Sequence, residues 1–515
     1  MAGRPDPSRR PGQPPKRRPE PQPKPPVQRK PRPIKPDKPK MDPKDLALRI
    51  FIAAMILGSI VMIVLCVGLA DGSEAPAPQA DSSASVDEDL QLGTVPTEKP
   101  KKPFWGKDEP EETVQPTQGS TNQVVSTASF MATGDLLIHK SIINQTSAVN
   151  QGDKGYNFDS VFKYLSGVTD TVDYAIANLE TTLFGPGKPY SGNPKFNTPD
   201  EIVDGAKKVG FDMMLTANNH CNDTDLDGVL RTLKVVREKG LATLGTNLND
   251  EETKYAIQDI NGIRIGMLCY TYEDSRDPKQ VTFNYNPLPA KAQNLVCSFP
   301  KFENAKSRDP FYEKLTAKIA EMKEQGAEAI VLFMHWGEEY HLEASPDQKS
   351  MAQKLCDMGV DLIVGGHPHV VQPVELLTSS VDPNHKTVCL YSMGNAVSNQ
   401  RKAEMEKSCP TGHTEDGMLF EFTFEKYADG SVQLGSVDVI PTWVDMHNNA
   451  AGKREYNILP LEKDKKDQWE TMFGLSPGTV GFLNDSYKRT MDIVSAGLEA
   501  SNAWLEEARL QRMSA

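Results

Sequence analysis

The sequence predicts an α/β protein, and three observations support this prediction. Between about residues 125 and 445, short apolar runs typical of buried strands alternate with segments whose apolar residues recur at helical spacing. The run that ends in Gly365-Gly366 is short and β-branched, which favours a central strand that stops at a tight loop. Five runs end at polar clusters, and in α/β sheets binding sites collect at the carboxyl ends of strands. The clusters are Asp135, Glu180, Asn219-His220, His335 and His367/His369.

The last cluster, His367-Pro368-His369, is typical of a metal-binding loop. Residues two apart in an extended backbone point to the same side of the chain, and Pro368 fixes φ and removes a donor, which stiffens the loop. Two imidazoles held in parallel at the end of a strand suit a divalent metal ion. A loop with two surface histidines would give the same motif, so this cluster alone leaves both interpretations open.

The first 49 residues are predicted to form a disordered, basic, Pro-rich cytoplasmic tail. They contain 15 Lys and Arg against 5 Asp and Glu and show no apolar periodicity. Such a segment cannot bury enough surface to offset the entropy of ordering. Binding of nucleic acid is not expected, because no aromatic residues are interleaved with the charges.

Residues 50–70, from Ile50 to Ala70, are predicted to be a single uncleaved transmembrane anchor. These 21 residues carry no charge and are long enough to span a hydrocarbon core of about 30 Å. A cleaved signal peptide is the alternative, but the apolar run and the segment before it are both too long for one. The excess of Lys and Arg before the run predicts a cytoplasmic N-terminus and an extracytoplasmic main domain in the cell membrane.

Residues 71–124 are rich in Pro, Ser, Thr, Glu and Gln, which predicts a flexible extracytoplasmic linker. The net charge of −13, with about +10 in the tail, leaves about −23 on the rest of the chain, which disfavours nucleic acid and favours cations. Outside the anchor, six cysteines form no CxxC pattern, and buried free thiols are expected. Export permits disulfides, but the sequence assigns no pairs.

The domain at 125–445 is predicted to be followed by a C-terminal helical extension at 446–515. In that extension, Tyr487–Glu506 has apolar residues at helical intervals, and we expect it to pack on the domain. The expected helices of the domain are Phe158–Leu165, Asp200–Val209, Asp225–Lys239, Phe311–Gln325 and Gln348–Met358. The expected strands are Val124–Thr133, Tyr174–Ala177, Phe211–Thr216, Tyr255–Ile260, Ile263–Tyr270, Ala329–Met334 and the run before Gly365, with antiparallel strands at Val388–Met393, Met418–Phe424 and Val432–Val444.

Together the five clusters offer carboxylate, amide and imidazole ligands. About four to six such ligands suit one divalent ion, and about six or seven suit two ions bridged by a carboxylate. Each residue also has a plain structural interpretation: Asp135 as a helix cap, Glu180 as a surface acid, His220 as a satisfied buried histidine. Five clusters at one edge favour a functional site over coincidence.

The clusters lie in six motifs whose order and spacing resemble those of the CapA family of capsule-synthesis proteins, a branch of the calcineurin-like metallophosphoesterase superfamily. The likeness runs from about Ser126 to Pro441. The motifs are Thr133-Gly134-Asp135, Ala177–Thr181, Leu215–Asp223, His335–Tyr340, Gly366–His369 and Tyr391–Asn395.

This resemblance implies a four-layer α/β/β/α metallophosphoesterase-like sandwich with its site at the sheet edge. It also implies one or two divalent metal ions of the Mn, Fe or Zn type. By the same resemblance, Asp135 holds one metal, Glu180 takes the place of the bridging carboxylate, and Asn219 holds the second metal. The histidines that complete the two ligand sets are His335, His367 and His369.

The catalytic residues are carried over in the same way, with departures from the superfamily pattern. His220 takes the place of the imidazole that protonates the leaving oxygen, and Asp223 can orient it. The usual Asp-x-His is missing, and His139, four residues after the first Asp, is expected on a helix surface instead. The bridging residue is Glu180 where Asp is usual, and Asp225 stands where relatives often have Gly.

The candidate substrate-binding residues are Lys188, Lys195, Glu339 and Asn395. The two lysines lie in a Gly/Pro-rich stretch where they can hold an anionic substrate, although solvated loop lysines are the commoner case. Glu339 can also support the histidines from outside the ligand set. Two long polar segments, 273–309 and 398–415, are long enough to act as lids.

Two functions therefore stay open. The first is a membrane-anchored, non-hydrolytic subunit in poly-γ-glutamate capsule synthesis or export, which would act with other capsule or poly-γ-glutamate synthase subunits. The second is a metal-dependent phosphoesterase with a cell-envelope substrate, in which His220 is the general acid. An anionic polymer or a phosphoester is the expected substrate, and nucleic acid is not. A scaffold that has lost its metal is disfavoured, because the ligand set is intact.

Overall fold

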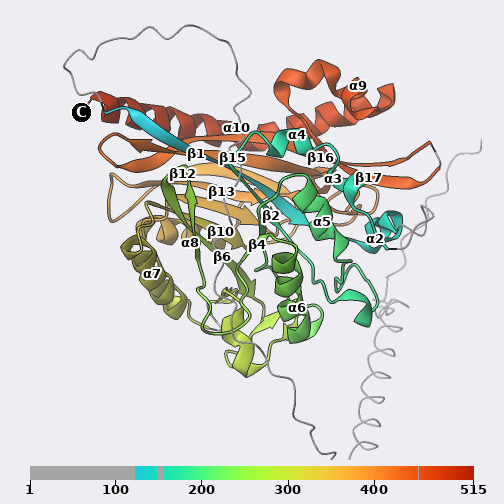
Figure 1. Cartoon of the computed structure of the whole chain (residues 1–515), viewed down its shortest axis with the longest axis horizontal. Coiled ribbons are helices and arrows are strands. Elements are labelled where there is room, and N and C mark those ends of the chain that lie inside the picture. Colours follow the sequence, from blue (N-terminus) through green and yellow to red (C-terminus); the bar gives the residue numbers. More distant parts are fainter. Residues whose placement is uncertain (1–121, 148–154, 305, 451, 515) are drawn as a thin grey trace, which may run out of the picture. The chain divides into compact units, whose positions relative to one another are not determined.

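The computed structural model describes residues 122–147, 155–304, 306–450 and 452–514 (Figure 1). The predicted tail at 1–49, the anchor at 50–70 and the linker at 71–124 up to residue 121 lie outside the described residues. Over the ranges that are described, no helix combines the length and the apolar character needed to cross a membrane.

The first sheet has eight strands in the described part of the chain, in the order β17-β16-β15-β1-β2-β3-β4, with β14 beside β1. Strands β1 to β4 run parallel, and β15 to β17 extend the sheet antiparallel on the other side of β1. The strands are β1 (Val124–Leu136), β2 (Tyr174–Asn178), β3 (Met213–Leu215), β4 (Ala242–Leu244), β14 (Asn395–Val397), β15 (Asp416–Tyr427), β16 (Val432–Asn448) and β17 (Arg454–Pro460).

The second sheet has seven strands in the described residues, in the order β12-β13-β11-β10-β6-β5, with β9 beside β6. Its middle strands β13, β11, β10 and β6 run parallel, and both edges are antiparallel. The strands are β5 (Ala256–Ile260), β6 (Ile263–Glu273), β9 (Ser298–Pro300), β10 (Ala329–His335), β11 (Leu362–Gly366), β12 (Val371–Thr378) and β13 (Lys386–Met393). A separate hairpin joins β7 (Thr282–Phe283) to β8 (Asn286–Pro287).

The inner faces of the two sheets share one apolar core, and helices pack on both outer faces. Phe130 of β1 and Val331 of β10 belong to the shared core, whereas α5 packs outside the first sheet and α7 and α8 outside the second. The protein is therefore a mixed α/β fold built on two packed sheets.

The helices are α2 (Lys140–Thr146), α3 (Asp159–Phe162), α4 (Ser166–Thr169), α5 (Glu201–Lys208), α6 (Asp225–Glu238), α7 (Asp309–Glu324), α8 (Pro346–Asp357), α9 (Trp469–Phe473) and α10 (Pro477–Ser514), with short 3-10 turns η2 (Gly185–Gly187), η3 (Ala290–Leu295), η4 (His413–Glu415) and η5 (Lys463–Gln468).

Helix α10 is the long red helix of Figure 1 and lies along β12 and β16. Val494 and Leu498 of α10 enter the core between the sheets. The approach to β12 is so close that a Cβ on Gly497 would lie 1.9 Å from the carbonyl oxygen of Val374. Only glycine fits there, so the helix continues the domain rather than standing apart from it.

The structure differs from the sequence prediction in three places. The helix predicted at Phe158–Leu165 is shorter than expected, because α3 covers only Asp159–Phe162 and the next helix, α4, begins after the predicted range. The extension predicted at 446–515 starts with the end of β16 and with β17, whose alternating polar and apolar residues pair with β16. Strand β13, predicted as antiparallel at Val388–Met393, pairs antiparallel with β12 as expected but parallel with β11.

Candidate metal centre

Five strands from both sheets deliver polar side chains to one buried place. Strands β1, β2 and β3 come from the first sheet, and β10 and β11 from the second, and the polar residues stand at or just after their carboxyl ends. The parallel strands of each sheet end at the same edge, which is why residues far apart in the sequence meet there. The residues are Asp135, Glu180, Asn219, His335, His367 and His369, all buried.

Three of these residues form a group with the geometry of a metal site. Glu180, His367 and His369 each offer one ligand atom, and these atoms lie within 4.8 Å of one another. Two more residues adjoin the group: His335 Nε2 is 3.4 Å from Glu180 Oε1, and Asp135 Oδ2 is 3.2 Å from His369 Nδ1. We call these five residues the His/Glu cluster.

The cluster leaves polar atoms that no protein group satisfies. Within the described residues, neither carboxylate oxygen of Glu180 has a hydrogen-bond partner, although the residue is 0% exposed. The Nδ1 atom of His367 is also buried without a partner. Buried polar atoms are nearly always hydrogen-bonded, so each exception requires a reason. Carboxylate oxygen and imidazole nitrogen together are ligands that Mn, Fe and Zn accept, so the residues fit a divalent ion.

Burial and charge shift the pKa values within the cluster in opposite directions. Burial, followed by the negative charges of Asp135 and Glu339, raises the pKa of Glu180 well above its usual range. Burial and then the charge of His335 hold the pKa of His367 well below its usual range. A neutral imidazole is the form that binds a metal ion, so His367 is ready to do so without first losing a proton.

His369 and Asp135 are coupled differently. Burial lowers the pKa of His369, but the hydrogen bonds to Asp135 and Asn395 and the charges of Asp135 and Glu339 together outweigh burial and raise it overall. In the same way, burial raises the pKa of Asp135, and His369 and His335 together lower it overall. In the absence of another cation, His369 and Asp135 therefore partly satisfy each other.

The loop after β11 is strained, which corrects the expectation of an extended backbone. His367 has φ +98° and His369 has φ +57°, and positive φ values are uncommon for residues other than glycine, although His adopts them more often than most. The two rings still approach one another, with centroids 5.9 Å apart. Strain of about 1–3 kcal/mol per residue is retained mainly at functional sites, so the loop conformation supports a binding role.

Asn219 lies against the histidine of β10. Its Oδ1 is 2.7 Å from His335 Nε2. Burial lowers the pKa of His335 to about 3, with Asp135 opposing the shift. Both side chains are therefore neutral, and they offer an amide oxygen and an imidazole nitrogen as candidate metal ligands.

His220 and Asp223 form a hydrogen-bonded pair beside the cluster. His220 Nδ1 lies 2.7 Å from Asp223 Oδ2, and the same oxygen accepts from the backbone N–H of Phe196 at 2.6 Å. Asn284, at the tip of the β7–β8 hairpin, donates to Asp223 Oδ1 at 2.9 Å. Because Asp223 accepts a hydrogen bond from Nδ1–H of His220, Nε2 is the ring nitrogen that can exchange a proton with a substrate.

The four residues that the sequence predicted to bind substrate are poorly placed for that role. Lys188 Nζ is bound to Asp225 at 2.9 Å, and Lys195 Nζ donates to Asn286 at 3.1 Å. Asn395 is fully buried behind the cluster, where its Oδ1 lies 3.1 Å from His369 Nδ1. Glu339 is exposed, and its charge reaches the cluster from the solvent side.

The two departures from the superfamily pattern have local explanations. His139 is the residue before α2, where its Nδ1 meets the carbonyl oxygen of Leu137 at 3.1 Å. Its ring packs edge-on against Phe196, which separates it from His220. Asp225 has φ +69°, a conformation that glycine adopts freely and that Asp tolerates better than most residues.

Sequence reasoning missed the residues that hold the cluster from behind. Asn178 at the end of β2 donates to Asp135 Oδ1 at 2.7 Å, and Asn218 donates to Asn178 Oδ1 at 3.2 Å. Tyr272 at the end of β6 packs edge-on against His367, with ring centroids 4.8 Å apart. A signal existed for the two asparagines, since both stand inside the quoted motifs, but none existed for Tyr272.

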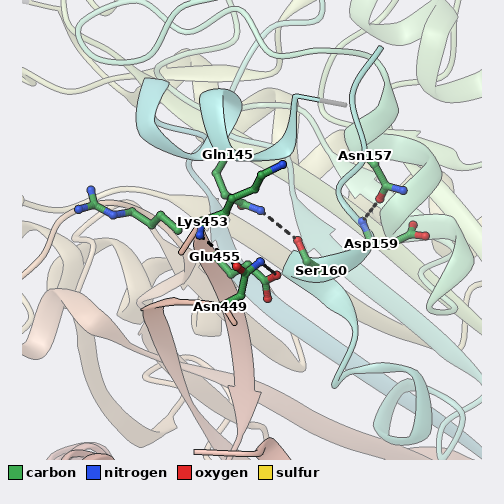
Figure 2. A pocket seen from close by; sticks show the side chains of 8 residues that line it. Gln145, Asn157, Asp159, Ser160, Asn449, Lys453 and Glu455 are labelled. Atoms are coloured by element: carbon green, nitrogen blue, oxygen red, sulfur yellow. Dashed lines mark hydrogen bonds between the residues drawn. The ribbon is translucent and has the colours of Figure 1, made fainter. Parts of the chain in front are cut away.

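A surface cavity of about 420 Å³ lies elsewhere (Figure 2). Its walls come from α2, α3 and the β16–β17 turn, and none of its lining residues belongs to the His/Glu cluster. Gln145, Ser160 and Glu455 lie around it. It therefore does not bear on the candidate metal centre.

Residues 129–400 match the family described as bacterial capsule synthesis protein PGA_cap, which is more than half of the chain. The chain belongs to this capsule synthesis family. All residues of the His/Glu cluster, together with His220 and Asp223, lie inside the matched region.

Related proteins agree with this family. The chain is 27% identical to the PGA biosynthesis protein CapA of Bacillus subtilis (strain 168) over 68% of the chain and 81% of that protein. It is 28% identical to the capsule biosynthesis protein CapA of Bacillus anthracis over 56% of the chain and 63% of that protein. A solved calcineurin-like phosphoesterase, YfkN from Bacillus subtilis, aligns over 70% of the chain and 99% of that structure with 14% identity and a TM-score of 0.30.

Proposed function

We propose that this capsule synthesis family member acts in the synthesis or export of poly-γ-glutamate through a divalent metal site. The observation that carries the proposal is the His/Glu cluster, which the matched family region contains in full. The named roles of the CapA relatives supply the process. The predicted anchor would place the domain outside the cell membrane, where it would meet the polymer and other synthase subunits.

Six residues would hold the metal. Glu180, His367 and His369 form the group, because their ligand atoms already lie close together and two of the residues have unsatisfied atoms. When bound, a divalent ion would supply Lewis-acid polarisation to an oxygen of the substrate. The side chains that would complete one or two ligand sets are Asp135, Asn219 and His335.

The second candidate function is hydrolysis of a phosphoester on a cell-envelope substrate. The His220–Asp223 pair favours it, because Asp223 fixes the tautomer and leaves Nε2 to donate a proton to a leaving oxygen. Phe196 restrains the His220 ring, with ring centroids 4.7 Å apart. An assembly subunit needs no such proton donor, so His220 separates the two functions.

The experiment compares His220→Gln with Asp135→Ala in the full chain, expressed in a poly-γ-glutamate-producing bacterium whose own CapA has been removed. We expect Asp135→Ala to abolish polymer output, because it removes a metal ligand. We expect His220→Gln to leave the output nearly unchanged. In the phosphoesterase alternative, His220→Gln instead lowers phosphoester turnover by the purified chain by about 10²–10⁴-fold.

Metal content of both purified variants is the control. His220→Gln should keep its metal, since His220 contacts Asp223 rather than the His/Glu cluster. If the unmodified chain does not restore polymer in that host, the capsule proposal is wrong. If Asp135→Ala restores it as well as the unmodified chain, the metal site has no part in the process.

A further inference from the structure

A lysine that the sequence did not single out stands beside the His/Glu cluster. Lys301 follows β9, whose pairing with β6 sets Phe299 opposite Tyr272. The ammonium nitrogen of Lys301 lies over the ring of Tyr272, 4.6 Å from its centroid. A cation within about 6 Å of an aromatic face is attracted to it electrostatically, and the ammonium group of a lysine has three N–H donors with which it can also bind an anion.

Tyr272 connects this lysine to two of the imidazoles. Its ring packs edge-on against His367 with centroids 4.8 Å apart and lies nearly parallel to His335 at 6.4 Å. The charge of Lys301 is accordingly one of the causes, after burial and the neighbouring histidines, that lower the pKa of His367. Lys301 thus brings a positive charge to the side of the cluster that His367 faces.

The backbone of Lys301 is held rigidly. Its N–H donates to the carbonyl oxygen of Glu273 at 3.0 Å, and its carbonyl oxygen accepts from Arg308 Nη2 at 2.6 Å. Arg308 is 1% exposed and also donates to Asp347 at 2.6 Å. This buried arginine thereby ties the loop after β9 to helix α8 and fixes the position from which the lysine extends.

The charge of Lys301 is only weakly neutralised. Its nearest carboxylate is Glu338, with Nζ and Oε1 3.5 Å apart and the glutamate side chain 55% exposed. Exposed ion pairs of this kind contribute little to stability, so a ligand oxyanion can replace Glu338. Lys188, in contrast, is bound both to Asp225 and to the carbonyl oxygen of Thr224.

We propose that Lys301 binds an oxyanion of the substrate, a phosphate or a carboxylate, next to the His/Glu cluster. The part of the chain beyond the basic tail carries about −23 charges, so an anionic substrate needs a local cation to approach. The inference rests on the proposed function only for the identity of the substrate. The residue itself is assigned by the contacts above.

The test measures binding of two probes to the metal-loaded full chain in detergent by titration calorimetry at low salt. The probes are inorganic phosphate and a short γ-linked glutamate oligomer, which separate a phosphoester ligand from a capsule polymer. The variants are Lys301→Gln, Glu338→Gln and the double variant. Lys354→Gln is the matched control, because Lys354 lies over the ring of Tyr312 at the same 4.6 Å, away from the cluster.

We expect Lys301→Gln to weaken binding of at least one probe about tenfold, the effect of losing one charge-assisted contact. Glu338→Gln should tighten binding a few-fold, about the strength of a surface ion pair, and the double variant should behave as Lys301→Gln does. Lys354→Gln should have no effect. Metal content must stay unchanged in all four variants.

Several outcomes would overturn the assignment: neither probe binds the unmodified chain, Lys301→Gln binds both probes normally, or Lys301→Gln has lost its metal. Weakening of phosphate binding with no binding of the oligomer keeps Lys301 as an oxyanion contact and contradicts the capsule function. Weakening of oligomer binding supports both.

Discussion

Glu180 and Asp416 are both fully buried carboxylates, but they differ in their hydrogen-bond partners. Asp416, at the start of β15, is 1% exposed, and both of its oxygens accept hydrogen bonds. Arg489 of α10 donates to Oδ2 at 2.6 Å and to Oδ1 at 2.7 Å, and Ser486 donates to Oδ1 at 2.7 Å. Neither oxygen of Glu180 has any hydrogen-bond partner among the described residues.

Burial of a carboxylate does not by itself identify a metal site, as Asp416 and Glu180 show. Burial raises the pKa of Asp416 to about 6, against the opposing effect of Arg489, and raises that of Glu180 too. A buried charge is tolerated when its partners are built in, and Arg489 meets that need for Asp416. At Glu180 the His335 imidazole lies 3.4 Å from Oε1, and neither carboxylate oxygen has a hydrogen-bond partner among the described residues, so both oxygens stay available to a ligand.

The largest expected effect is on metal binding, tested by Glu180→Gln. This variant should lose nearly all bound metal, because an amide replaces the carboxylate whose ligand atom lies within 4.8 Å of those of His367 and His369. The same change should stabilise the metal-free chain at pH 7–8 by about 1–3 kcal/mol, since it removes a buried carboxylate with no partner. Metal analysis and urea denaturation with a chelator measure the two effects.

A matched control for this prediction is His139→Ala. His139 lies near the cluster but outside the metal-binding group, so its removal should leave the metal content unchanged. Full metal content in Glu180→Gln would contradict the assignment of the centre. A destabilised metal-free Glu180→Gln would show that the carboxylate has a protein partner after all.

The second prediction concerns the ion pair between Asp416 and Arg489. Arg489→Met should lower the free energy of unfolding by about 3–5 kcal/mol, because it leaves Asp416 buried without a counter-charge. Adding Asp416→Asn should recover much of the loss. Lys488→Met, at a neighbouring position whose ion pair with Asp492 is exposed, should change stability by less than about 1 kcal/mol. Equal losses in Arg489→Met and Lys488→Met would contradict this account.

The sequence predicted the members of the His/Glu cluster because each follows an apolar run, and parallel strands bring such positions together. It did not predict Tyr272 or Lys301, because their place depends on how β6 and β9 pair with each other. Nor did it predict the pairing of Asp416 with Arg489, which are 73 residues apart. Contacts between distant elements leave no local pattern, so neither residue stood out.

Local rules also misjudged some backbone conformations. The prediction for His367 and His369 assumed an extended chain, but the tight loop after Gly366 forces both into positive φ. A Cβ on Gly366 would lie 3.2 Å from Asp135 Oδ1, so the glycine lets the loop approach the first sheet. The sequence showed the glycine, but only the packing of the two sheets shows what it permits.

The smallest expected effect concerns Glu421, a carboxylate that is less buried than Glu180 and Asp416. Burial, then the charges of Asp438 and Glu462, raise its pKa to about 7. Asp438 is its direct neighbour on β16. Like Glu180 it has acidic neighbours, but no imidazole of the described residues is among the groups that shift its pKa, so it tests how much burial and like charge cost without a metal site.

Because the pKa of Glu421 is higher in the folded state than in the unfolded state, its ionisation destabilises the fold as the pH rises from about 4.5 to about 7. Glu421→Gln removes this cost, so the variant should gain about 1–2 kcal/mol over the unmodified chain at pH 8 and much less at pH 5. Glu313→Gln, at an exposed position on α7, should show no such difference. Urea denaturation at both pH values measures the gain. An equal gain at pH 5 and pH 8 would mean that packing, not ionisation, sets the stability at this strand pair, and the cost at Glu180 could then not be attributed to charge.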